Sequence, residues 1–190
     1  MQTEVHEKLR PYMDDYDNIT ESQSDYCSRF REFYGQFPND VIVQWFYDHP
    51  DSLSQNNWLN YNKLTFSLVR LPMDAVKEDC FRKNPFVEQY CHYFLDGKIT
   101  PRIQRLARYI EENGSWPVPP VVLDNIESNL VFPWGVECSS PYQLLEGHHR
   151  FAALIALLDD AELLTEHEIW LCSRETECKM SKMSGHPIID

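Results

Sequence analysis

The feature that most constrains the fold is the stretch YQLLEGHHRFAALIALL, residues 142–158. Its first four residues are typical of a short strand, and residues 149–158 are apolar on nearly every side of a helix. A helix that is apolar all round must be buried. The chain must therefore build a core around this helix, with Gly147 at the junction between strand and helix.

Other strand and helix patterns surround this junction. Residues 63–72 alternate as a strand does, with Leu64, Phe66 and Leu68 on one side, and residues 84–97 read as a helix. The clearest helix has Thr100 as N-cap, Pro101 as its first residue and Gly114 just past its end. Short strands are predicted within 116–125 and 167–172. These patterns predict an α+β fold, a mixed sheet with packed helices.

The N-terminal third is predicted to be helical. Tyr26, Phe30, Phe33 and Phe37 fall on one helical face, and a second helix follows that Asn39 is placed to cap. Residues 51–57 are rich in turn formers. We expect a helical extension over 1–57, a core over 58–175 and a polar tail over 176–190.

Composition limits the class of protein. The chain is 43% hydrophobic and 13% aromatic, which is typical of a folded protein, and it has no apolar run of membrane-spanning length. With no signal peptide pattern, we expect a soluble, cytoplasmic protein. The six cysteines form no C-x-x-C pair, so reduced thiols are expected.

The net charge of −13 is concentrated at the two ends of the chain. Nonspecific DNA binding depends on Lys and Arg neutralising phosphates, so the charge disfavours DNA as a partner. Acidic ends would serve solubility, or they would contact a protein partner.

The EGHHR box, residues 146–150, carries the candidate chemistry. A glycine before a helix lets an anion approach the backbone N–H groups, and Arg150 can form a fork on phosphate oxygens. His148 and His149 add donors that strengthen when protonated, and Glu146 is a candidate base or ligand for Mg²⁺. The alternative is a capping turn in which Arg150 pairs with Glu146.

Several residues outside the box are weaker candidates. Arg70, in an apolar strand, is either a phosphate contact or an outward side chain. Arg102, Arg105 and Arg108 lie three apart, as on a solvated helix face or a nucleic-acid grip. His167 is interpreted as a surface residue, with a metal site shared with His148 as the alternative. Three tryptophans are interpreted as core or loop anchors, with base-stacking platforms as the alternative: Trp116, Trp134 and Trp170.

The order of these elements, ending in "EGHHRFAAL", resembles the core of the ParB/sulfiredoxin superfamily over about residues 64–172. Sulfiredoxins have a reactive cysteine where this chain has His148, so their chemistry is not expected. Nor do we expect centromere recognition, because no helix-turn-helix pattern follows. The box is more similar to that of ParB-like small enzymes, including free-serine kinases. The resemblance also implies polar groups after the first core strand, here Asp74, Glu78 or Asp79.

Three functions follow as hypotheses. The first is a protein that binds ATP, ADP or CTP on Gly147–Arg150 with Mg²⁺ and hydrolyses or transfers a phosphoryl group. The second is a metal-dependent nuclease that grips DNA through the three arginines. The third is a non-enzymatic regulator whose acidic ends bind a protein partner.

Overall fold

The computed structural model describes residues 5, 7–98, 100–159 and 161–174. In chain order its helices and strands are α2 (Gln23–Arg31), α3 (Asn39–Ile42), the π-helix η1 (Val43–Tyr47), α4 (Ser52–Gln55), the 3₁₀ turns η2 (Asn57–Leu59) and η3 (Tyr61–Lys63), β1 (Leu64–Pro72), α5 (Met73–Val76), α6 (Asp79–Arg82), α7 (Pro85–Leu95), α8 (Pro101–Asn113), β2 (Val121–Asp124), β3 (Tyr142–Glu146), α9 (His148–Ala156) and β4 (Glu166–Arg174). The predicted tail over 176–190 lies outside the described residues.

The four strands form one mixed sheet in the order β1-β4-β2-β3. β1 pairs with β4 and β2 with β3 in antiparallel fashion, whereas β2 and β4 are parallel. The prediction of a mixed sheet with packed helices is confirmed. In this order β1 and β3 form opposite edges, so two strands separate β1 from the EGHHR box at the end of β3.

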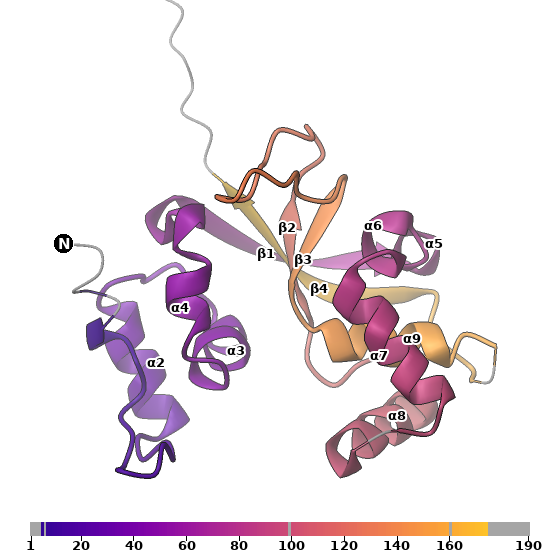
Figure 1. The fold of residues 1–190 in the computed structure, drawn as a ribbon, viewed down its shortest axis with the longest axis horizontal. Coiled ribbons are helices and arrows are strands. Elements are labelled where there is room, and N and C mark those ends of the chain that lie inside the picture. The colour runs from indigo at the N-terminus through magenta and orange to yellow at the C-terminus, as the bar shows by residue number, and fades with distance from the viewer. Residues whose placement is uncertain (1–4, 6, 99, 160, 175–190) are drawn as a thin grey trace, which may run out of the picture.

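Helices cover both faces of the sheet, with the N-terminal helices on one face and α5 to α9 on the other (Figure 1). On the N-terminal side, Phe30, Phe37 and Phe46 pack against each other and against sheet residues such as Leu123 and Cys172. The aromatic spacing that predicted these helices therefore reflects one hydrophobic cluster, shared between residues 9–61 and the sheet.

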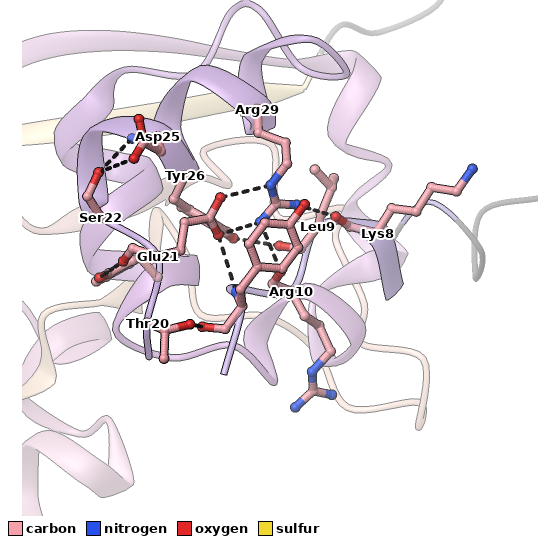
Figure 2. Close-up of polar contacts among 11 residues, drawn as sticks. Lys8, Leu9, Arg10, Thr20, Glu21, Ser22, Asp25, Tyr26 and Arg29 are labelled. Atoms are coloured by element: carbon pink, nitrogen blue, oxygen red, sulfur yellow. Dashed lines mark hydrogen bonds and ion pairs between the residues drawn. The ribbon is translucent and has the colours of Figure 1, made fainter. Parts of the chain in front are cut away.

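Arg29 on α2 fixes the segment that precedes this helix (Figure 2). Its guanidinium pairs with Glu21 at 2.6 Å and donates to the carbonyl oxygens of Lys8 and Arg10. It also lies 4.5 Å from the ring centroid of Tyr12. Through these contacts the Arg29 side chain holds residues 8–21 against α2.

On the other face, α9 is buried as its composition predicts. Phe151 and Leu154 are fully buried, and α7 and α8 pack against the helix. The Phe151 ring stacks on Phe81 with centroids 4.4 Å apart, and Trp116 lies 5.0 Å away. This packing holds the start of α9, and so the box, in a fixed place.

Three local predictions are corrected. Pro38, not Asn39, occupies the N-cap of α3, and it makes no side-chain cap bond. Phe33 lies beyond the end of α2 and is 39% exposed. Residues 51–57 contain the short helix α4 and the start of a 3₁₀ turn, because Leu53 is anchored in the core.

The described cysteines are free thiols, and four of the five are buried. Cys178 lies outside the described residues. Within the described residues, no helix combines the length and apolar character needed to cross a membrane.

Candidate functional site

The box forms a tight turn between β3 and α9. Gly147 has φ of +103° in the left-handed region, which favours glycine, and it occupies the N-cap of α9 without a side-chain bond. A Cβ built on Gly147 would lie 2.6 Å from the Cβ of Pro120, so the backbone also approaches its neighbour closely. The first N–H groups of α9 have no partner within the helix, as at any helix N-terminus.

Arg150 points into the protein. Its Nη1 donates to the Val118 carbonyl oxygen at 3.0 Å and its Nη2 to Gln44 Oε1 at 2.6 Å. Gln44 in turn donates to the Pro119 carbonyl oxygen at 3.0 Å. Burial lowers the pKa of Arg150 to about 10, and its side chain is 12% exposed. These contacts bind the start of α9 to the N-terminal helices and to the segment before β2.

Glu146 lies at the centre of a charged group. Its Oε1 is 3.6 Å from Arg150 Nη2 and 3.9 Å from His49 Nε2. Burial raises the pKa of Glu146, while Arg150, His49 and a backbone hydrogen bond from Gly147 oppose that rise. The pairing of Glu146 with Arg150, expected of a capping turn, is present.

The two box histidines contact aromatic residues of α7. His148 meets the edge of Phe86 at 5.4 Å, and His149 stacks on Tyr90 with centroids 3.8 Å apart. Burial lowers the pKa of His148 to about 4 and lowers that of His149 as well. His148 is therefore neutral at pH 7 and stays neutral well below it, because burial disfavours the imidazolium.

A cavity of about 810 Å³ opens at this turn. Its walls are the segment 48–56, the start of α7, the loop 132–139 and the end of β3 with the start of α9. The residues with chemistry or a flat ring are Asp48, His49, Asp51, Phe86, Tyr90, Phe132, Trp134, Glu137, Glu146, His148 and His149. The volume lies within the range of small-molecule sites.

The lining is acidic. Four carboxylates line the cavity, and the described lining residues include no Lys or Arg. An anionic ligand would therefore need a cation to accompany it. Across the described residues, no group of three or more His, Cys, Asp or Glu is placed to hold a metal ion. Glu146 is engaged by Arg150 and His49, so these residues do not fit a preformed Mg²⁺ site.

The predicted arginines separate into two groups. Arg102, exposed at the start of α8, lies close enough for its charge to lower the pKa of His149. Arg105 and Arg108 are exposed and do not line the cavity. Arg70 is 71% exposed and lies 3.8 Å from Glu166 at the opposite edge of the sheet. The structure does not bring Arg70 to the box.

The acidic residues after β1 also lie away from the box. Asp79 pairs with Lys83 on the surface, and Glu78 is exposed. Asp74 lines a separate, smaller cavity of about 370 Å³. None of the three lines the cavity at the box.

His167 is not a surface residue. It is 1% exposed, its Nδ1 lies 2.9 Å from the Ser115 hydroxyl, and its ring centroid is 5.1 Å from that of Trp116. The surface interpretation was wrong because β4 is an inner strand covered on this face. Trp116 is a core anchor that donates to the Glu168 carbonyl oxygen, whereas Trp134 is 65% exposed.

Sequence reasoning missed most of the residues around the cavity, among them Gln44, His49 and Phe132. Gln44 and His49 belong to the N-terminal third, far from the box in sequence, and no local pattern marks them. Gln44 does lie in a π-helix, a form that often accompanies functional sites, but π-helices are not readable from this sequence.

Comparison with known proteins adds no relative. The chain matches no family model, no curated protein and no solved structure. The resemblance to the ParB/sulfiredoxin superfamily therefore stays a prediction.

Proposed function

We propose that the chain binds a nucleotide as its magnesium complex in the cavity at the start of α9, and hydrolyses or transfers a phosphoryl group. The observation that carries this proposal is the convergence on one cavity of an uncapped helix N-terminus, three histidines, four carboxylates and a stacked aromatic pair. The helix N-terminus and the histidines would meet the phosphates, the carboxylates would meet the magnesium ion, and the aromatic pair would meet the base.

Phosphate oxygens would be held by the first N–H groups of α9 and by ring N–H groups of His148 and His149. Arg150 has another task in this proposal. Its donors are bonded to the Val118 carbonyl oxygen and to Gln44, so Arg150 would hold the turn in position and would not bind phosphate directly. Arg102, whose charge lowers the pKa of His149, would add positive potential for the phosphates without contacting them.

The acidic lining requires that Mg²⁺ enters with the nucleotide. Free ATP would meet four carboxylates without a compensating Lys or Arg in the described lining. Mg²⁺ is commonly held by substrate phosphates and only one or two carboxylates. Glu146 would then be the base, because burial raises its pKa toward the working range of a proton acceptor.

Titration calorimetry with ATP, ADP and CTP tests this proposal. Binding should occur with Mg²⁺ and be lost with EDTA, and His148→Ala should weaken it about tenfold or more. The matched control is His92→Ala, an exposed histidine on α7 that does not line the cavity. If none of the three nucleotides binds, or if both variants behave like the wild type, the proposal is wrong.

The nuclease hypothesis needs a grip on DNA outside the cavity. Arg102, Arg105 and Arg108 do not line the cavity, although the charge of Arg102 lowers the pKa of His149. Cleavage of plasmid DNA that is abolished by EDTA and by His148→Ala would favour it. For the regulator hypothesis, co-purification of a stoichiometric protein partner is the corresponding test.

A further inference from the structure

Trp134 is an exposed aromatic residue on the wall of the cavity. It is 65% exposed, and its ring is stacked on Phe132 with centroids 4.6 Å apart and planes 8° from parallel. Both rings line the cavity. One face of the indole is covered by Phe132, and the exposed fraction leaves the rest of the ring available to a ligand.

The stacked pair is supported from behind. Trp58, which follows α4, packs edge-on against Phe132 with centroids 5.2 Å apart. Within the loop, the Phe132 N–H donates to the Val136 carbonyl oxygen at 2.8 Å, and the Gly135 N–H donates to that of Phe132 at 2.9 Å. The Phe132–Trp134 pair therefore lies on a hydrogen-bonded turn, and Trp58 packs against Phe132.

The base of the loop is anchored as well. Asn125 is 3% exposed, and its side-chain amide donates to the carbonyl oxygens of Cys138 and Ser139. Its Oδ1 accepts from the Leu130 N–H at 3.2 Å. One buried side chain thus joins both ends of the loop that carries Phe132 and Trp134.

We propose that Trp134 is the stacking platform for the base of the nucleotide, with Phe132 as its support. This inference rests on the proposed function, because the ligand is the same nucleotide whose phosphates lie at the start of α9. An indole ring with one face already covered loses little freedom when a flat heteroaromatic ring lies on the other. Loss of one aromatic platform typically weakens binding of a base by roughly fivefold to more than a hundredfold.

Two ligands separate the platform from the phosphate site. MgATP carries both base and phosphates, whereas magnesium tripolyphosphate carries phosphates alone. Trp134→Ala should weaken MgATP at least about fivefold and leave tripolyphosphate unchanged, and Trp134→Phe should restore most of the affinity. Tyr16→Ala, which removes an 84% exposed aromatic ring outside the cavity, is the control. Thermal unfolding of each variant checks that the fold is kept.

Fluorescence gives a second readout. Trp134 is the most exposed of the five tryptophans, so stacking should quench emission with MgATP and not with tripolyphosphate. The quenching should vanish in Trp134→Phe. If both ligands bind and Trp134→Ala weakens neither, or weakens both equally, the platform is wrong and the phosphate site stands. If neither ligand binds wild type, the proposed function itself fails.

Discussion

Substitution of Gly147 by alanine tests the geometry on which the site depends. The backbone at Gly147 has φ of +103°, where a side chain costs about 1–2 kcal/mol. The new Cβ would also lie 2.6 Å from the Cβ of Pro120 and 3.1 Å from Arg150 Nε. Relief of such overpacking costs about 1–3 kcal/mol, so Gly147→Ala should lower the free energy of unfolding by about 2–5 kcal/mol.

Gly97→Ala is the matched control. Gly97 also has a positive φ, +67°, but a Cβ there would meet nothing within 4 Å. It should therefore show the backbone cost alone, about 1–2 kcal/mol. Urea unfolding of the wild type and both variants measures the two losses. Equal losses would mean that the turn relaxes away from Pro120 freely, and the close approach at the box would then have no energetic weight.

Other substitutions address the remaining contacts. Arg150→Ala should cost about 3 kcal/mol in urea unfolding, since it leaves the partly buried Glu146 without its main cationic partner and removes the bonds to Val118 and Gln44. Arg70→Ala, at a side chain that is 71% exposed, should change stability by under about 0.5 kcal/mol. Trp116→Phe removes the 2.7 Å bond to a backbone carbonyl and should cost about 1–2 kcal/mol, measured by thermal unfolding; no loss would mean that water replaces the indole. His148 has a folded pKa of about 4 against an ordinary 6.5, so the unfolded chain takes up its proton first and stability falls as pH drops from 6.5 to 4. His148→Gln should remove up to about 3 kcal/mol of that fall, seen as a flatter pH profile of unfolding; parallel profiles would contradict the partly buried, neutral imidazole.

Local chemistry explains which parts of the fold were predictable. Thr100, Pro101 and Gly114 define α8 because a cap, a first-turn proline and a left-handed glycine act within a few residues. The apolar run after Gly147 predicted the buried helix for the same reason: its apolar character on nearly every side is visible in the local sequence. The N-cap was misplaced by one position: Pro38 occupies it, and Asn39 is the first residue of α3, in which Val41 and Ile42 are buried.

The candidate site was predictable only in part. The box itself was recognised from its residues, but the orientation of Arg150 is decided by Gln44 and Val118, which lie far away in sequence. The low pKa of His148 was not predictable for a similar reason, because its burial depends on how α7 packs over the box. Tertiary neighbours, which no local pattern encodes, decide both the hydrogen bonds of Arg150 and the lowered pKa of His148.

These contacts make the N-terminal third part of the site. Gln44 joins Arg150, His49 and Asp48 line the cavity, and residues 9–61 cover one face of the sheet. Each large side chain buried there contributes about 1.5–3 kcal/mol, so their joint loss exceeds the 5–15 kcal/mol stability of a typical domain.

Deletion of residues 1–57 should therefore unfold the rest, seen as lost cooperativity in urea and rapid proteolysis. Gln44→Ala, a single change, should keep the fold and weaken MgATP binding through Arg150. A deletion fragment that unfolds cooperatively and binds MgATP like the full chain would contradict this prediction. The core would then fold independently, and the N-terminal helices would not be needed to form the site.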